Sequence, residues 1–480
     1  MQTYVYVRRA TFINLLVRKK RTKASTSSGG HSMEEWRKLI RKVREPNEQV
    51  INDVGQKVIV WADEEGILHD VPAGVLCCKR CGAYGVYSSL DDVCQNCGRI
   101  TSFEVLTPPP FDELWLPYRY PHALFVDLEV EAIAWDVEEF IRKVLVMPEE
   151  EHYKILTAWI IASYRQQDWK TAPYLQFIGP VESGKTRALE VLSLLSYRGV
   201  LFAVVSPAAL CRLIEKYHIT PCVDQAEYNF HRKSEQGREN FNIWMCGYRR
   251  GQFYTKASKE SEEDVIKRNV FSFKALASTR AFDENIATRS ITFYMREGIP
   301  KVERISDEII EEAQKLRSHL LYLHLLQKSP FPTETEYAKK LHGRLREIFS
   351  PLLSVAKALD YGYDDIFEFA LKDKKEKLKE LQYSDEGMIV RTIYDMIQDN
   401  EGEHGLGGDL VALRLGDIAS RLEMSTRTLG WKLKALNIER KKDEKGRYID
   451  LTDKKTLDQL QYLFRKYGYV QDSEQPSEWF

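Results

Sequence analysis

The residues with the clearest chemistry form one unbroken segment, Gly179-Pro180-Val181-Glu182-Ser183-Gly184-Lys185-Thr186. Two glycines with four residues between them, followed at once by Lys and Thr, match the spacing of a phosphate-binding loop. Such a loop turns tightly, so that backbone N–H groups and a helix N-terminus point at a polyphosphate, whose charge Lys185 also meets. The hydroxyl of Thr186 is placed to hold Mg²⁺. The segment therefore predicts that the chain binds ATP together with Mg²⁺.

The segments on either side of this loop supply the context that the motif needs. Residues 174–178 are an apolar run that predicts a strand, and residues 187–195 predict a helix. A strand that enters the loop and a helix that leaves it are the setting in which the motif binds phosphate. The alternative is a glycine-containing turn between a strand and a helix that binds no ligand.

A second acidic anchor follows along the chain. Residues 219–224 predict a strand that ends in Asp224, the Walker B position from which a carboxylate reaches Mg²⁺ through water. Many ATPases carry Glu directly after this Asp, whereas this chain has Gln225, which can orient a water but cannot accept its proton. Glu227 lies two residues further on and is the alternative catalytic residue. The sequence thus supports nucleotide binding more strongly than fast hydrolysis.

Two further stretches predict residues that respond to the γ-phosphate. The strand predicted over residues 270–277 is followed by Ser278 and Thr279, whose hydroxyls can sense that phosphate. Arg289 directly precedes another predicted strand. An ordinary surface arginine that caps a loop is the alternative for Arg289, because arginine is commonly exposed.

Basic residues that can contact nucleic acid lie between these segments. A predicted helix runs into Gly247, and the chain then carries Arg249, Arg250 and, slightly later, Lys256. These cations could line a central pore and hold the phosphates of single-stranded DNA. Four acidic residues within 260–264 dilute that charge, so a solvated face is the alternative.

Four cysteines have the spacing of a zinc site. Cys78 and Cys81 form one CxxCG turn, and Cys94 and Cys97 form a second. Tetrahedral Zn²⁺ takes four thiolates, and each such turn points two sulfurs at one ion, so the pair predicts a zinc ribbon. A disulfide or redox site is the alternative. The ribbon either holds together a hairpin that is too small to fold alone or also presents an edge to DNA.

Length and composition limit the class of protein. A chain of 480 residues with 43% hydrophobic and 29% charged residues indicates about three or four globular domains. The net charge of −1 excludes a global field that attracts nucleic acid, so such binding needs local patches. No apolar run approaches the roughly 20 residues of a membrane span, so we expect no membrane partner. Cys211, Cys222 and Cys246 are scattered as in proteins of a reducing cytoplasm, where we expect this chain.

The last part of the chain predicts a DNA-binding fold. Helices are expected over residues 385–398, 414–422 and 426–436, followed by strands over 438–442 and 447–451 and a closing helix. This order is typical of a winged helix, whose recognition helix reaches the major groove of duplex DNA while the wing meets phosphates. The candidate contacts are Arg427, Lys432 and Lys434 on the helix and Lys441 and Lys442 on the wing. The alternative is a winged helix that contacts protein or regulates the ATPase lid.

Several phrases of the sequence together resemble one family of replication proteins. GPVESGKTRALEVL, SPAAL, TPCVDQAE, GYRRG, KALAST and ATRSITFYMRE look like the AAA+-type helicase module of phage, plasmid and integrated-element replication proteins, which is similar to primase-helicase and MCM-like groups. The resemblance covers about residues 138–360. It implies an ASCE sheet, a homo-oligomeric ring expected to be a hexamer, and an arginine finger.

The resemblance also implies roles for individual residues. By that match Arg289 is the arginine finger donated to the ATP of a neighbouring subunit, and Thr279 or Ser278 is sensor 1. Arg344 is the sensor-2 candidate on a helical lid. A solvated helix residue is the alternative for Arg344.

The expected fold class is a multidomain α/β protein with an ASCE P-loop ATPase core, a zinc ribbon and a C-terminal winged helix. Residues 1–32 are basic and contain no acid, so they indicate a disordered arm, a targeting peptide or a start upstream of the true initiator Met33. The expected domains are 33–106 with the ribbon, a linker 107–137, the ATPase core 138–300, a helical lid 301–372, a connector 373–384, the winged helix 385–470 and a tail 471–480.

These expectations combine into an ATP-dependent DNA motor or helicase of a mobile element. Its cofactors would be ATP, Mg²⁺ and Zn²⁺, with single-stranded DNA in the pore and duplex DNA at the winged helix. One alternative is a DNA-bound switch or helicase loader that binds ATP but hydrolyses it slowly. Another is a transcriptional regulator built on the winged helix.

Overall fold

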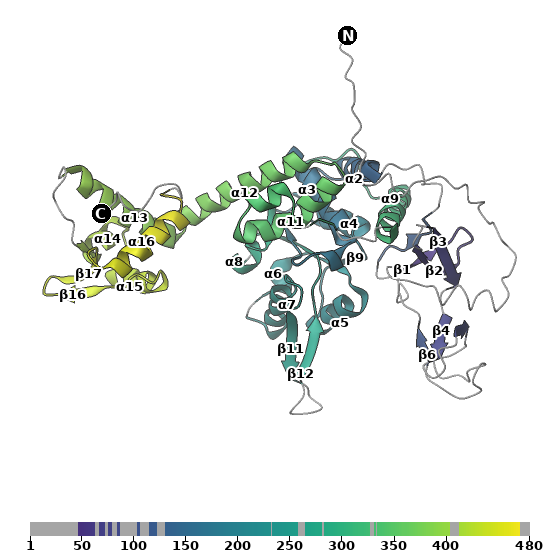
Figure 1. Ribbon diagram of the computed structural model, residues 1–480, viewed down its shortest axis with the longest axis horizontal. Coiled ribbons are helices and arrows are strands. Elements are labelled where there is room, and N and C mark those ends of the chain that lie inside the picture. Colours follow the sequence, from purple (N-terminus) through teal and green to yellow (C-terminus); the bar gives the residue numbers. More distant parts are fainter. Residues whose placement is uncertain are drawn as a thin grey trace, which may run out of the picture. The chain divides into compact units, whose positions relative to one another are not determined.

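A computed structural model describes most of the chain as two compact units, Met1–Phe367 and Glu368–Phe480 (Figure 1). The residues described are 47–62, 67–72, 75–78, 84–86, 103–105, 115–121, 130–231, 233–257, 265–280, 283–326, 331–332, 334–403 and 412–470. Within these residues no helix is both long enough and apolar enough to cross a membrane.

A parallel sheet of five strands forms the centre of the first unit, in the order β14-β8-β13-β10-β9. The strands are β8 (Tyr174–Ile178), β9 (Gly199–Phe202), β10 (Thr220–Val223), β13 (Lys274–Ser278) and β14 (Ser290–Tyr294). Every residue of β8 and β13 is buried, as expected for a parallel sheet that is covered on both faces. The first unit is therefore a mixed α/β structure whose parallel sheet is consistent with that of a P-loop ATPase.

The register of this sheet fixes which loops share an edge. Ile178 at the end of β8 lies beside Ser278 of β13 and Tyr294 of β14. Tyr174 at the start of β8 lies beside Ser290. Because all these strands run in the same direction, the loops that follow them meet at one edge, and the loops that precede them meet at the opposite edge.

Helices cover the sheet, as Figure 1 shows. They are α2 (Val130–Val144), α3 (Glu150–Ser163), α4 (Lys185–Leu195), α5 (Pro207–Tyr217), α6 (Ala226–Asn229), α7 (Glu235–Cys246), α8 (Glu284–Ala287), α9 (Asp307–Leu326), α10 (Glu336–Lys340) and α11 (Gly343–Ala358). Helix α3 is buried along almost its whole length, and its Trp159 donates an indole hydrogen bond to the carbonyl of Pro173 at 2.7 Å. This bond ties the helix to the residue that leads into β8.

Two small sheets belong to the N-terminal part of the first unit. The larger has the order β3-β2-β1-β7 and contains β1 (Asn47–Ile51), β2 (Lys57–Ala62), β3 (Leu68–Pro72) and β7 (Tyr118–Arg119). The smaller is antiparallel, with β4 (Val75–Cys78) between β5 (Tyr84–Val86) and β6 (Phe103–Val105). Cys78 ends β4, but its side chain and residues Cys81, Cys94 and Cys97 lie outside the described residues, so the zinc site stays a prediction.

A buried ion pair joins the first of these sheets to the ATPase body. Glu48 of β1 and Arg198, which precedes β9, are 1% and 4% exposed. The Arg198 guanidinium donates to the two carboxylate oxygens of Glu48 at 3.0 and 3.1 Å, and its remaining nitrogen donates to the carbonyl of Tyr217 at 2.6 Å. Trp115 and Tyr197 lie against the guanidinium, at 5.6 and 5.0 Å from their ring centroids. Both charges are therefore removed from water and compensated by each other.

The second unit is a small helical domain with a three-stranded sheet. Its elements are the C-terminal part of α12 (Tyr363–Tyr383), then α13 (Asp385–Glu403), β15 (Ala412–Arg414), α14 (Leu415–Arg421), α15 (Thr426–Ala435), β16 (Lys441–Asp443), β17 (Gly446–Asp450) and α16 (Lys454–Lys466). The sheet is antiparallel in the order β15-β17-β16. Most of the connector expected over residues 373–384 is part of the continuous helix α12.

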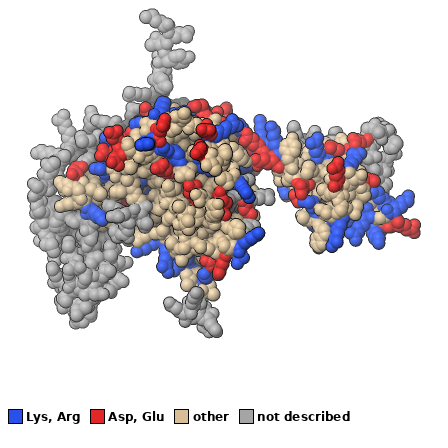
Figure 2. All heavy atoms as spheres, turned by 180° about the vertical axis from the view of Figure 1, so that it is seen from behind, with Lys and Arg blue, Asp and Glu red and all other residues tan. Residues whose placement is uncertain are grey.

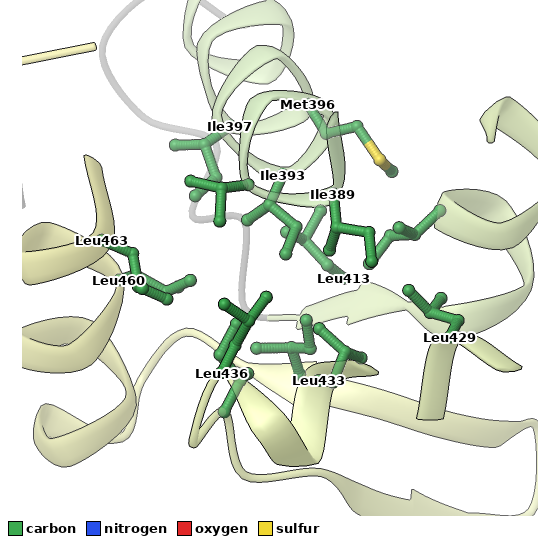
Figure 3. Packing of buried hydrophobic residues seen from close by; sticks show 14 of the residues in the cluster. Ile389, Ile393, Met396, Ile397, Leu413, Leu429, Leu433, Leu436, Leu460 and Leu463 are labelled. Carbon is green, nitrogen blue, oxygen red and sulfur yellow. The ribbon is translucent and has the colours of Figure 1, made fainter. Parts of the chain in front are cut away.

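Apolar residues from four helices and the sheet form the core of this unit (Figure 3). Ile389 and Ile393 of α13 and Leu429 and Leu433 of α15 are buried there together with Leu460 of α16. The Ser425 hydroxyl accepts a hydrogen bond from the Thr428 backbone N–H at 3.1 Å and so begins α15. The core fixes which side of α15 faces outward.

We predict that Glu48→Ala lowers the free energy of unfolding by about 3 to 5 kcal/mol, because it leaves the Arg198 charge buried and unpaired. Chemical denaturation followed by tryptophan fluorescence measures this change. The double variant Glu48→Ala/Arg198→Met removes both charges and should recover most of the loss. Equal stability of the single and double variants would contradict the role given to the pair.

Candidate functional site

The loop from Gly179 to Thr186 connects the end of β8 to the start of α4. Glu182 and Gly184 have positive φ angles of 67° and 85°, so the backbone turns sharply before the helix begins. A side chain at Gly179 would place its Cβ 2.6 Å from the Met295 carbonyl oxygen and from the Ser183 hydroxyl. Only glycine fits at that position, because both neighbours would have to move.

Lys185 is the first residue of α4, and its side chain folds back into the loop that precedes the helix. Its side chain is 9% exposed, and its ammonium donates hydrogen bonds to the carbonyl of Pro180 and to the hydroxyl of Ser183, the latter at 3.3 Å. The loop therefore brings a positive charge beside the N-terminus of α4, where backbone N–H groups have no partner within the helix. An anion bound there would meet both.

Thr186, at the start of α4, lies next to Asp224, which is 38 residues further along the chain. The Thr186 hydroxyl donates to one oxygen of Asp224 at 2.9 Å. Asp224 follows β10, and its other oxygen accepts a hydrogen bond from the Gln225 backbone N–H at 2.8 Å. A hydroxyl and a carboxylate in contact at the entrance to α4 are oxygen ligands of the type that Mg²⁺ prefers. The residues present therefore fit a magnesium ion.

Glu227 and Thr279 also meet at this edge of the sheet. The Thr279 hydroxyl donates to one Glu227 oxygen at 3.0 Å, and the Thr279 backbone N–H donates to the same oxygen at 3.4 Å. The other Glu227 oxygen is buried and accepts no hydrogen bond from the described residues. Gln225 has a φ of 47° and an exposed side chain. Thr279, directly after β13, thus fixes one carboxylate oxygen of Glu227, while the other accepts no hydrogen bond from the described residues. The Gln225 side chain has no such anchor among these residues.

Two asparagines hold the turn that carries Asp224, and no local sequence pattern marks them. The Asn229 amide donates to the carbonyls of Ala203 and Asp224 at 2.8 and 3.0 Å, and its oxygen accepts from the Val205 N–H at 3.2 Å. The Asn240 amide donates to the carbonyls of Val205 and Asn229 at 3.1 and 3.0 Å. Both are buried, so these bonds satisfy main-chain groups that water cannot reach.

Arg289 lies at the edge of the sheet opposite the phosphate-binding loop. Its carbonyl accepts a hydrogen bond from the backbone N–H of Tyr174, the first residue of β8, at 3.1 Å. The four residue steps of β8 separate this point from the loop by roughly 13 Å at about 3.3 Å per residue. Burial, followed by the nearby charge of Arg344, lowers the pKa of the Arg289 guanidinium.

Arg289 belongs to a group that we call the Tyr248 cluster, formed by Tyr248, Arg249, Arg289, Arg344 and Glu347. The guanidinium groups of Arg289 and Arg344 lie 5.7 and 4.9 Å from the Tyr248 ring centroid. Arg344 and Arg249 pair with different oxygens of Glu347. Because the Tyr248 carbonyl accepts from the N–H of Ala172 just before β8, the cluster lies at the edge opposite Lys185. The structure therefore brings Arg344 to Arg289 and not to the loop.

The other cations expected near a pore are also engaged. Arg250 donates to the carbonyl of Gln166 at 2.9 Å, and burial lowers its pKa. Lys256 pairs with Glu239 at 2.6 Å. Lys256 lies on β11 (Phe253–Ala257), which pairs with β12 (Val265–Asn269) in a hairpin that projects from the body (Figure 1).

Lysine and arginine gather along one side of the second unit (Figure 2). The candidate DNA contacts there fall into two groups. Lys432 pairs with Asp385 and Glu386 at 2.9 and 3.0 Å, and Lys441 pairs with Asp450 at 2.6 Å. In contrast, Arg427, Lys434 and Lys442 are exposed and form no ion pair within the part of the chain that the structure describes. Among all the residues that the structure describes, no group of three or more His, Cys, Asp or Glu side chains could hold a metal ion.

No family model matches this chain, and no curated protein matches it. Among solved structures, it is similar to the apo C-terminal region of NrS-1, with 11% identity over 86% of this chain and 98% of that chain and a TM-score of 0.35. JCV helicase has 14% identity over 48% of this chain and 69% of that chain, with a TM-score of 0.22. Drosophila ORC bound to DNA has 11% identity over 75% and 95% of the two chains, with a TM-score of 0.17. These values are too low to assign the chain to a family.

We predict that Asn229→Ala lowers the free energy of unfolding by about 2 to 4 kcal/mol, because each buried main-chain group that it leaves unpaired costs about 1 to 3 kcal/mol. Thermal or chemical denaturation measures the loss. The adjacent variant Tyr228→Ala is the matched control: its side chain is 74% exposed, so its effect should stay within about 0.5 kcal/mol. Similar effects of the two variants would show that the Asn229 network does not hold the turn.

Proposed function

We propose that this protein is an ATP-dependent DNA motor or helicase with an ASCE P-loop core, of the kind found in the replication proteins of mobile elements. The contact between Thr186 and Asp224 at 2.9 Å is the observation that carries the proposal. It joins the residue after the P-loop lysine to the acid that ends another strand, which is the pair that holds Mg²⁺ in P-loop ATPases. Lys185 and the N-terminus of α4 would bind the phosphates of ATP.

Hydrolysis in this site would use water as the nucleophile. Glu227 would orient the water and take up its proton. Thr279 donates to one oxygen of Glu227 and so links that carboxylate to the end of β13. The water oxygen would bond to the γ-phosphorus while the bond to the β–γ bridging oxygen breaks. Thr186 and Asp224 would hold the Mg²⁺ that offsets the charge of the leaving ADP when it is bound.

A ring of identical subunits, which we propose to be a hexamer, gives the Tyr248 cluster a function. Arg289 and Arg344 lie too far from the P-loop of their own subunit to touch its nucleotide, since the length of β8 separates them. In a ring, the edge that carries Arg289 would face the P-loop of the neighbouring subunit. Arg289 would then stabilise the charge that develops during hydrolysis, and Arg344 would act beside it.

The remaining parts supply DNA contacts in this proposal. The hairpin β11–β12, with Arg249, Arg250 and Lys256 near it, would face single-stranded DNA in the pore. The order of α14, α15 and the β16–β17 hairpin supports a winged helix in the second unit. Cys78, Cys81, Cys94 and Cys97 would hold Zn²⁺ in a ribbon whose role is structural or includes a DNA-facing edge.

Gln225 favours a second candidate function. It occupies the position where many ATPases have their catalytic glutamate, and its exposed side chain cannot accept a proton. If Glu227 does not replace that glutamate, the protein is a DNA-bound switch or helicase loader that binds ATP and hydrolyses it slowly. A transcriptional regulator based on the winged helix is a third candidate, which would bind duplex DNA independently of Lys185.

We expect single-stranded DNA to stimulate ATPase turnover, and Lys185→Ala to abolish it. Glu227→Gln should lower turnover by at least about 100-fold while ATP binding is retained, because general-base catalysis contributes about 10² to 10⁴ in rate. Gln225→Ala should have a much smaller effect. Turnover assays with a fluorescent ATP analogue for binding separate these outcomes. Tight ATP binding with negligible turnover in the unmodified protein would favour the switch.

We also expect two inactive variants to restore activity when mixed. Lys185→Ala keeps Arg289 but cannot hydrolyse ATP, and Arg289→Ala keeps the P-loop but lacks the finger. Mixed rings contain interfaces where an intact P-loop meets an intact Arg289, so part of the turnover should return. ATPase assays across mixing ratios measure this, with each variant alone as the control. No recovery, despite mixed assembly shown by pull-down of differently tagged subunits, would contradict a finger that acts between subunits.

A further inference from the structure

The outward face of α15 carries a large aromatic side chain with nothing against it in the described structure. Trp431 is 66% exposed and makes no ring contact or hydrogen bond with any described residue. The other exposed tryptophan of the described chain, Trp135, contacts the ring of Tyr361 at 5.0 Å. A single exposed aromatic ring is common on protein surfaces, so it is the charged residues surrounding Trp431 that indicate a partner.

Cations flank Trp431 on the same face. Arg427 lies four residues before it and Lys434 three residues after it, a spacing that places all three on one side of a helix. This side is opposite Leu429 and Leu433, which are fully buried in the core. Lys432 points elsewhere, since it pairs with two acids at the start of α13. The exposed face of α15 thus combines one aromatic ring with two positive charges.

The adjacent hairpin adds positive charge, because two of its three acids are already paired, whereas Glu444 at its turn is exposed and forms no ion pair with a described residue. Asp443 pairs with Arg414 at 2.6 Å, and Asp450 pairs with Lys441 at 2.6 Å. Glu439 pairs with Lys455. Exposed cations without an ion pair among the described residues remain on the hairpin: Lys442, Lys445 and Arg447. The surface made by α15 and this hairpin therefore suits a polyanion with an exposed aromatic group.

Base-edge readout in the major groove uses arginine or lysine on guanine, asparagine or glutamine on adenine, and serine or threonine on several bases. Helix α15 has no asparagine or glutamine, so its exposed face lacks the side chains that read adenine. Tryptophan, by contrast, stacks on the face of any base that is not already stacked between its neighbours.

We propose that Trp431 stacks on an unpaired DNA base, and that α15 and the β16–β17 hairpin bind the junction where duplex DNA opens into single strands. Arg427 and Lys434 hold the phosphates beside the unpaired base. Lys442 and Arg447 hold phosphates of the adjoining duplex. The inference rests on the proposed action on DNA and replaces plain duplex binding, expected for this unit from the sequence, with recognition of a fork.

The test measures binding of the full-length protein to three DNA probes by fluorescence anisotropy: a blunt duplex, a single strand and a forked duplex. Trp431→Ala should weaken binding to the fork by roughly 5- to 100-fold, the loss of one base–aromatic stack, and change blunt-duplex affinity by less than about 2-fold. Trp431→Phe should retain most of the affinity for the fork. Tyr462→Ala removes another aromatic residue of this unit, 57% exposed, and should bind all three probes as the unmodified protein does.

A fork with 2-aminopurine as its first unpaired base reports stacking directly. Its fluorescence should be quenched by the unmodified protein and by Trp431→Phe less strongly, but not by Trp431→Ala. A thermal melt shows whether Trp431→Ala is folded, and Trp431→Phe keeps the test decisive if it is not. Lys442→Ala/Arg447→Ala should weaken both duplex-containing probes and reduce the salt dependence of binding.

Four results would overturn the inference. Equal loss of fork and blunt-duplex affinity in Trp431→Ala would indicate an ordinary duplex contact. Unchanged binding and unchanged quenching, with DNA-stimulated ATPase intact, would remove the role of Trp431 and leave the proposed function standing. A changed oligomer size in Trp431→Ala with unchanged DNA binding would identify this face as an interface between copies. Failure of the unmodified protein to bind any probe would overturn the proposed function as well.

Discussion

The parallel pairing of β8 with β13 and β14, together with that of β13 with β10, is the constraint on which the rest of the first unit depends. It brings three separate parts of the chain, the phosphate-binding loop, Asp224 with its turn, and Thr279, to a single edge of the sheet. The same pairing sends Arg289 to the other edge. One hydrogen-bonded register therefore both gathers the proposed nucleotide-binding residues and separates them from Arg289. In the proposed ring, each complete site would combine residues from two subunits.

The sequence was most informative where chemistry and backbone geometry coincide in a short segment. The loop at Gly179–Thr186, its flanking strand and its helix follow from local spacing, and the structure has them where they were expected. Asn229 and Asn240 could not be found in this way. Their function is to satisfy carbonyls of Ala203, Asp224 and Val205, and those partners are adjacent only after the chain has folded.

The sequence also cannot show which charged side chains already have a partner of opposite charge. The sequence identifies Arg249, Lys432 and Lys441 as cations that can meet DNA, but it cannot tell that each of them already has a carboxylate partner. An ion pair at the surface contributes little to stability, yet it reduces the charge offered to a polyanion. Exposure of an apolar ring is equally hidden. From the sequence, Trp431 looks like an ordinary hydrophobic residue of a helix. The structure shows that it lies on the side of α15 opposite the residues buried in the core.

The pair formed by Glu48 and Arg198 has a mechanical consequence. Sliding the N-terminal sheet away from the ATPase body would place two opposite charges in an apolar interior without compensation, which costs several kcal/mol. The pair therefore resists separation of the sheet from the body. In the proposed motor, a movement of the P-loop region would carry the N-terminal sheet with it.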